Sequence, residues 1–228
     1  MRFRANPLQT LVFNLRLTFP QPGNIIFGTE TQQTMRFAMS QARVLTDHEQ
    51  KRILAVVSQT KHAARNRMAF ILSYQAGMRV GEIAALTIGD VFEADSKTVR
   101  SQIRLSSEIT KGGHARVVFV SDRLRREIER YRATLSDSVK SERPLLQTQK
   151  HTAFSANTLC QLMGDLYQQA GLDGATSHSG RRWFITKLAH SGISAKVIMQ
   201  LAGHKHLTTT QRYIEVNDDL MRAAVEVL

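Results

Sequence analysis

The sequence predicts an α+β protein that is mainly α, with a small antiparallel β-sheet. After residue 41, apolar residues recur at steps of three and four, the period of an amphipathic helix. Two short runs, residues 97–105 and 115–120, are instead rich in β-branched residues and flank Gly112 and Gly113. Paired glycines are typical of the turn between antiparallel strands. At 228 residues the chain can form one sizeable domain with a short appendage.

Residues that begin or end helices divide the helical part of the chain. Serine, threonine, asparagine and aspartate favour the N-cap, and glycine favours the position just after the last turn. The expected N-caps are Thr46 or Asp47, Ser121 or Asp122, Ser155 and Asn217, and the expected stops are Gly77, Gly171, Gly192 and Gly203. The strands lie after Gly77 and the short helical run that follows it, and before the N-cap at Ser121 or Asp122. Their hairpin places Lys111 at or near a strand end.

The first 40 residues differ from the rest. They contain Pro7, Pro20 and Pro22 and show no sustained period, so we expect an irregular basic arm, followed by a catalytic-size domain over residues 41–228. The arm has no spanning helix and no signal-peptide core. The single cysteine, Cys160, permits no intrachain disulfide and lies in an apolar helical run, where we expect a buried thiol without chemistry. We expect a cytoplasmic protein with no membrane partner.

The charge balance indicates a polyanionic partner. Lys and Arg total 31 against 19 Asp and Glu, which gives a net charge of +12. A field of this sign attracts nucleic acid. Hydrophobic residues make up 42% of the chain, which excludes global disorder.

A set of polar residues near helix ends could perform phosphodiester transfer. Guanidinium groups bind the phosphate oxygens, a tyrosine hydroxyl can attack the phosphorus, and lysine or histidine can move protons. The set is Arg79, Lys111, His178, Arg181, His204 and Tyr213. Each has a simpler explanation alone: Arg79 and Glu82 could form a surface ion pair, and Tyr213 could be a core residue.

Two segments carry a resemblance to a known family. "AGMRVGEIAALTIGDV", followed by "HSGRRWFITKLAHSGISAKVIMQLAGHKHLTTTQRY", closely resembles the tyrosine recombinase family, also called the phage integrase family. The resemblance runs from about Val44 to the C-terminus and implies the fold of that family's catalytic domain. It also implies a site-specific DNA recombinase that forms a covalent 3′-phosphotyrosine, without metal or other cofactor.

The resemblance assigns a role to each candidate. Arg79 matches the first arginine of a G-x-R-x-x-E-x-x-x-L-x-x-x-D box, with Glu82 and Asp90 as its supporting acids. Lys111 is similar to the general acid toward the 5′ oxygen, with Lys97 as the alternative. The remaining residues follow the later boxes: His178 for the tyrosine proton, Arg181 for the phosphate with Arg182 beside it, His204 for the scissile phosphate, and Tyr213 as nucleophile.

The chain departs from the family pattern in two places. The commonest second box reads H-D-L-R-R, whereas this chain has Ser179 and Gly180, and we expect altered packing there. About 40 residues precede the catalytic part, too few for the family's separate DNA-gripping domain of roughly a hundred residues. Arg2, Arg4 and Arg16 could partly compensate through phosphate contacts.

The partners follow from the same resemblance. We expect double-stranded DNA and a homo-oligomer on DNA, a dimer to tetramer, in which the helix after Tyr213 packs on a neighbouring protomer or folds back on its own core. Three alternatives remain: a type IB topoisomerase, an accessory DNA-binding protein derived from a recombinase, and a metal-dependent phosphoesterase. The last would use His178, His190, His204 and His206.

Overall fold

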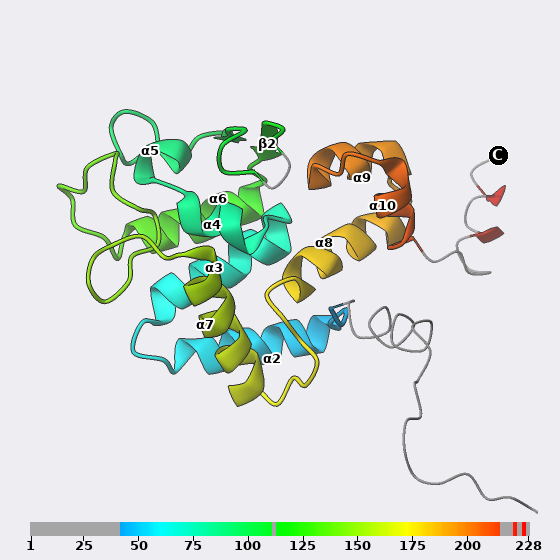
Figure 1. The fold of residues 1–228 in the computed structure, drawn as a ribbon, viewed down its shortest axis with the longest axis horizontal. Helices are drawn as coiled ribbons and strands as arrows, with labels where there is room; N and C mark the ends of the chain where they lie inside the picture. Colours follow the sequence, from blue (N-terminus) through cyan, green and yellow to red (C-terminus); the bar gives the residue numbers. More distant parts are fainter. Residues whose placement is uncertain (1–41, 111–112, 215–220, 223–224, 227–228) are drawn as a thin grey trace, which may run out of the picture. The chain divides into compact units, whose positions relative to one another are not determined.

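The computed structural model describes residues 42–110, 113–214, 221–222 and 225–226. The predicted arm and the segment headed by Asn217 lie outside these residues. The helices are α2 (Asp47–Ser58), α3 (Ala63–Ala76), α4 (Val80–Ala85), α5 (Ile88–Val91), α6 (Asp122–Arg132), α7 (Ala156–Gln169), α8 (Ser179–His190), α9 (Ala195–Ala202) and α10 (Leu207–Gln211). Strands β1 (Gln102–Leu105) and β2 (Arg116–Phe119) form an antiparallel pair (Figure 1). The predicted fold class is confirmed.

Helix α3 is the centre of the main hydrophobic core. Every residue from Met68 to Tyr74 is buried, because α2, α6 and α8 contact different faces of the helix. Such a helix is apolar on all sides. It ends at Gly77, as predicted, and the chain continues directly into α4. Arg79 therefore lies in the short link between the end of α3 and the start of α4.

A smaller core joins the last helices. Ile185, Ala189, Ile198 and Ala202 are buried together between α8 and α9. Figure 1 shows α9 and α10 at the far end of α8, and α9 also contacts β2. The breaks at Gly192 and Gly203 fall where the sequence predicts them. This arrangement brings residues after Gly203 next to the strand pair.

The two strands face each other where the sequence predicts them. β1 ends at Leu105 and β2 begins at Arg116, within one residue of the predicted bounds. The hydroxyl of Thr110 donates to the carbonyls of His114 (2.8 Å) and Ser107 (3.3 Å), which stabilises the loop away from the strands. Lys111, which the sequence places at or near a strand end, lies outside the described residues.

Cys160 is exposed, which corrects the expectation of a buried thiol. The buried stripe of α7 runs through Leu159, Met163 and Leu166, and Cys160 lies beside it with its sulfur 3.2 Å from the Ser177 hydroxyl. Among the residues that the structure describes, no helix combines the length and apolar character needed to cross a membrane.

Candidate active site

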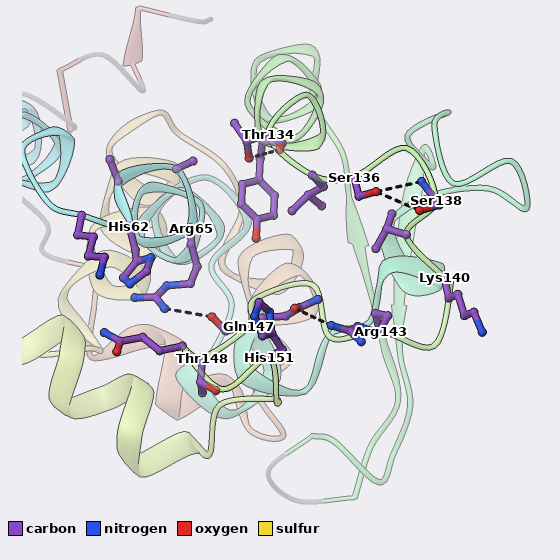
Figure 2. A pocket seen from close by; sticks show the side chains of 17 residues that line it. His62, Arg65, Thr134, Ser136, Ser138, Lys140, Arg143, Gln147, Thr148 and His151 are labelled. Atoms are coloured by element: carbon purple, nitrogen blue, oxygen red, sulfur yellow. Dashed lines mark hydrogen bonds between the residues drawn. The ribbon is translucent and has the colours of Figure 1, made fainter.

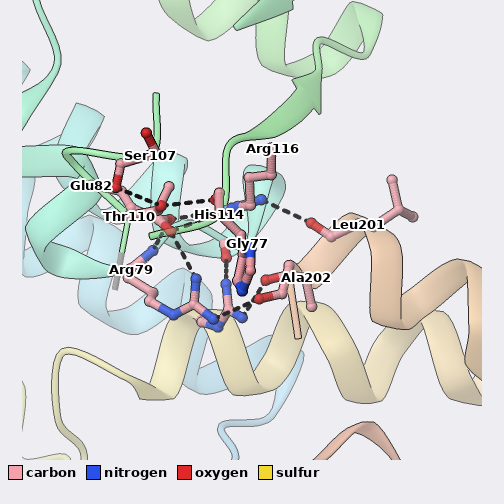
Figure 3. A network of polar contacts seen from close by, with 11 residues as sticks. Gly77, Arg79, Glu82, Ser107, Thr110, His114, Arg116, Leu201 and Ala202 are labelled. Atoms are coloured by element: carbon pink, nitrogen blue, oxygen red, sulfur yellow. Dashed lines mark hydrogen bonds and ion pairs between the residues drawn. The ribbon is translucent and has the colours of Figure 1, made fainter. Parts of the chain in front are cut away.

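Three arginines donate to three consecutive carbonyls at the C-terminal end of α9. Arg116 donates to Leu201 (2.8 Å), Arg181 to Ala202, and Arg79 to Gly203 (2.9 Å). The last carbonyls of a helix have no partner within the helix and carry its negative dipole end. Guanidinium groups from three separate parts of the chain satisfy them here (Figure 3). The end of α9 is therefore the point at which these arginines converge.

Glu82 forms ion pairs with two of these arginines, Arg79 and Arg116. Its Oε1 accepts from Arg79 Nη1 (2.8 Å), and its Oε2 accepts from Arg116 Nη2 (2.6 Å) and from the backbone N–H of Arg79 (2.8 Å). The Glu82 side chain is only 1% exposed, so this is no surface ion pair. Burial by itself would raise the pKa of Glu82, but the hydrogen bond and charge of Arg116 and the hydrogen bonds from Arg79 lower it on balance. Glu82 is therefore ionised.

Arg181 is the most buried of the three arginines, with 5% of the residue exposed against 9% for Arg116. Its guanidinium also donates to the carbonyl of Gly77, so it connects the end of α3 to the end of α9. Burial, followed by the charges of Arg79 and Arg116, lowers the pKa of Arg181 to about 9. The group still carries its charge at neutral pH. Three guanidinium groups against one carboxylate leave the cluster positively charged and suited to an anion.

A cavity of about 870 Å³ opens beside this cluster. Its lining includes Arg79, Thr110, Arg116, Gly203 and His204. The cavity is therefore lined by the first predicted arginine (Arg79), by the second predicted histidine (His204) and by Thr110 from the segment between the strands.

His204 follows the end of α9 directly. Its Nδ1 is 2.9 Å from the Thr210 hydroxyl. Burial, then the charges of Arg181, Arg79 and Arg116, lowers the pKa of His204 to about 4, so its imidazole is neutral at pH 7. A neutral imidazole has one N–H. If Thr210 donates to Nδ1, that N–H lies on Nε2, where it can donate to a phosphate oxygen.

Tyr213 lies against His204. The two rings are stacked with their centroids 5.8 Å apart and their planes at 18°, and the Arg182 guanidinium lies 5.3 Å from the Tyr213 ring centroid. Tyr213 also packs on the small core of α8 and α9 in its own chain. Arg79, Arg181, His204 and Tyr213 are thus connected by contacts through the end of α9.

His178 is exposed and caps α8 through its backbone, since its carbonyl accepts from Arg182 (2.9 Å). It lies one turn before Arg181 and Arg182. The departures from the second box have a packing reason, as expected: Ser179 accepts from the Thr176 N–H, and Gly180 faces Ser73 on α3. A Cβ at Gly180 would lie 2.4 Å from the Ser73 hydroxyl oxygen.

The other predicted residues do not join this cluster. Lys111 lies outside the described residues, and Thr110 and His114, which precede and follow it in the chain, line the cavity. Lys97 lies in an exposed turn, where its N–H donates to Asp95 (2.8 Å), and does not line the cavity. Asp90 forms a capping box with Thr87 at the start of α5. Within the described part of the chain, its carboxylate therefore accepts hydrogen bonds from Thr87 and not from Arg79.

A second cavity, larger at about 1140 Å³, lies where α3 begins, and its lining includes His62, Arg65 and Lys140 (Figure 2). None of the candidate residues that the structure describes lines it. Within the described ranges, no three His, Cys, Asp or Glu side chains come close enough to hold a metal ion. The histidine set of the phosphoesterase alternative is therefore not assembled as a ligand cluster.

Arg116 is the residue that sequence reasoning missed. It pairs with Leu105 across the strands and shares the buried face of β2 with Val118. The signal was present in the sequence, because alternation along the strand places a charged residue on the same face as a core valine. A charge at such a position needs a buried partner, which here is Glu82.

Comparisons with known proteins show which family the chain belongs to. Residues 43–219 match the phage integrase family. Tyrosine recombinase XerA of Pyrococcus horikoshii is 32% identical over 202 residues, which cover 86% of this chain and 65% of that protein. The chain thus spans less than two thirds of that relative's length.

Two solved structures show a similar fold. A crystal structure of XerA recombinase matches 81% of this chain and 62% of its own, with a TM-score of 0.62 and 24% identity. A Tn1549 transposon integrase in complex with a circular intermediate DNA matches 83% and 67%, with a TM-score of 0.63 and 19% identity. The match over residues 43–219 covers most of the chain, including every described candidate residue. The chain belongs to the phage integrase family, the family of the tyrosine recombinases.

Proposed function

We propose that this protein is a site-specific DNA recombinase that cleaves and rejoins strands through a covalent phosphotyrosine at Tyr213. The observation that carries the proposal is the stacking of Tyr213 on His204, next to a cluster with three arginines and one carboxylate. An excess of fixed positive charge beside a potential nucleophile suits a phosphodiester, whose transition state gains negative charge.

In the proposed reaction, the Tyr213 oxygen attacks the phosphorus. The bond from this oxygen to phosphorus forms as the bond to the 5′ oxygen breaks, which leaves a 3′-phosphotyrosine and a 5′-hydroxyl. Arg79, Arg181 and the N–H of His204 donate to phosphate oxygens, His178 handles the tyrosine proton, and Lys111 protonates the 5′ oxygen. Attack by a 5′-hydroxyl reverses each step. One ester replaces another, so the exchange needs no external source of energy.

The proposed partner is double-stranded DNA, with two to four protomers on each recombining complex. The net charge of +12 supports binding to a polyanion, and the similar Tn1549 integrase structure holds DNA. We also propose that the protein acts in the cytoplasm. We further propose that residues 1–40 form a basic arm and that the segment after Tyr213 contacts a neighbouring protomer. The arm and most of that segment lie outside the described residues.

The proposal is tested by trapping the covalent adduct. The protein is incubated with a pool of nicked duplexes that carry random or native flanking sequence, with chelator present, and adducts are separated under denaturing conditions. The nick releases a short strand after cleavage and prevents rejoining. We expect an adduct with the unaltered protein and with Tyr167→Phe, and none with Tyr213→Phe.

Tyr167 is the matched control because it is a buried core tyrosine on α7, whose hydroxyl bonds to Tyr74 and whose ring contacts Phe70. An adduct that persists in Tyr213→Phe would contradict the assignment of the nucleophile. DNA binding without any adduct from the unaltered protein would contradict the enzymatic proposal and favour an accessory DNA-binding role.

A further inference from the structure

We infer that Arg116 is a positioning residue for strand cleavage: it holds Arg79 and His204 in place by joining Glu82 to the end of α9. This inference rests on the proposed function. Arg116 belongs to β2, whereas Glu82 belongs to α4 and Leu201 to α9. Its side chain is 6% exposed and that of Glu82 is 1% exposed, so the pair is closed off from solvent.

The contacts of Arg116 leave it few donors for a substrate. Nη2 and Nε donate to the two oxygens of Glu82 (2.6 and 3.3 Å), and Nη1 donates to Leu201 (2.8 Å). This forked arrangement uses the planar geometry of a guanidinium, which a lysine ammonium does not have. Both arginines border the cavity, but the side chain of Arg79 is more exposed, at 19% against 6% for Arg116. The two arginines share one carboxylate but have different surroundings, so Arg79 is suited to contact phosphate and Arg116 to support it.

Gly203 shows how closely Arg116 fits the end of α9. Gly203 has a φ of +62°, and a Cβ added to it would lie 2.4 Å from Cδ of Arg116. The same glycine provides the carbonyl that accepts from Arg79, and His204 follows it. A displaced Arg116 therefore moves the acceptor of Arg79 and the backbone that carries His204. Small displacements of catalytic groups are costly, because reacting atoms must meet within narrow limits of distance and angle.

Two pairs of variants separate positioning from general stability. The first pair is Arg116→Lys and Arg132→Lys. Arg132 is equally buried at 8% exposed and donates to the carbonyls of Ser96 and Ser136, away from the cluster. The second pair is Gly203→Ala and Gly192→Ala. Gly192 also has a positive φ, of +75°, but a Cβ there would meet nothing within 4 Å.

Each variant is assayed for melting temperature, DNA affinity and the single-turnover rate of adduct formation on the nicked duplex. We expect Arg116→Lys and Gly203→Ala to slow cleavage by about 10- to 100-fold while DNA affinity stays near that of the unaltered protein. Arg132→Lys and Gly192→Ala should cleave at the normal rate even where their melting temperatures fall. Equal losses of rate within each pair would overturn the inference.

A second readout does not depend on cleavage. Arg116 is one of the charges that lower the pKa of His204. An NMR titration of the His204 imidazole should therefore show a higher pKa in Arg116→Met than in the unaltered protein, and no change in Arg132→Met. A pKa of His204 that is unchanged in Arg116→Met would overturn the inference. If the unaltered protein forms no adduct but this pKa rises, the proposed function fails and the link between Arg116 and His204 stands.

Discussion

The hydroxyl of Thr210 lies 2.9 Å from Nδ1 of His204, and this bond orients an imidazole that is stacked on Tyr213. Thr210 is fully buried at 0% exposed, so no water replaces its hydroxyl at this position without a rearrangement. The bond fixes the ring orientation, and if Thr210 donates to Nδ1 it also leaves the proton on Nε2. The geometry of the proposed nucleophile thus depends on a threonine that does not react.

Thr210→Val keeps the shape of the side chain and removes this hydrogen bond. We expect cleavage to slow by about fivefold, since one net hydrogen bond is worth about 1 kcal/mol. The rate of adduct formation on nicked DNA measures the effect. Thr208→Val is the matched control, because Thr208 lies on the same helix and is exposed. A normal rate in Thr210→Val would contradict an orienting role for this bond.

The stability of the protein should depend on the charge state of His204. Its pKa is about 4 in the folded protein and about 6.5 in an ordinary environment. Between these values the unfolded chain binds more protons at this residue, so stability falls as the pH falls from about 6.5 to about 4. Melting temperatures across this window should fall less steeply in His204→Gln. The same slope in His204→Gln as in the unaltered protein would contradict the depressed pKa.

Gly180 is needed where α8 crosses α3. The Cβ of an alanine there would lie 2.4 Å from Oγ and 2.9 Å from Cβ of Ser73. We expect Gly180→Ala to destabilise the protein by about 1–3 kcal/mol, as overpacking of a buried contact does. Ser73→Gly in the same chain removes both clashing atoms and should recover part of this loss. Denaturant unfolding measures the two free energies, and additive losses in the double variant would refute a direct contact.

We expect Arg181→Lys to impair strand cleavage. Its guanidinium donates to Gly77 and Ala202 at once and holds the ends of α3 and α9 together. A lysine ammonium lacks the forked donors for this bridge and for a phosphate, so we expect adduct formation to slow by roughly 100-fold or more. Arg125→Lys, at a half-buried arginine that donates to Val99, is the control and should cleave normally. Equal activity in both variants would argue against a phosphate contact from Arg181.

Local signals in the sequence predicted most of the fold. The caps Thr46, Ser121 and Ser155 and the stops Gly77 and Gly203 stand where the sequence places them, because capping depends on a few neighbouring residues. The facing ends of the two strands, at Leu105 and Arg116, also lie within one residue of the predicted bounds. Cys160 was misplaced because it borders the apolar stripe of α7 without belonging to it.

Less of the candidate site than of the fold could be predicted from the sequence. The residue types of Arg79, His204 and Tyr213 indicated the chemistry, but their convergence on the end of α9 depends on contacts between distant parts of the chain. Arg116 was missed because it belongs to no motif by itself. Its role depends on Glu82, 34 positions away in the sequence, and on the carbonyl of Leu201.

The central claim is that Tyr213 becomes bonded to the 3′ end of a cleaved strand. The most direct measurement is to digest the trapped adduct with protease and nuclease, identify the modified peptide by mass spectrometry, and determine which DNA end is free. The account predicts a phosphate on Tyr213, a 3′ linkage and a free 5′-hydroxyl. A phosphate on another residue, or a linkage to the 5′ end, would contradict it.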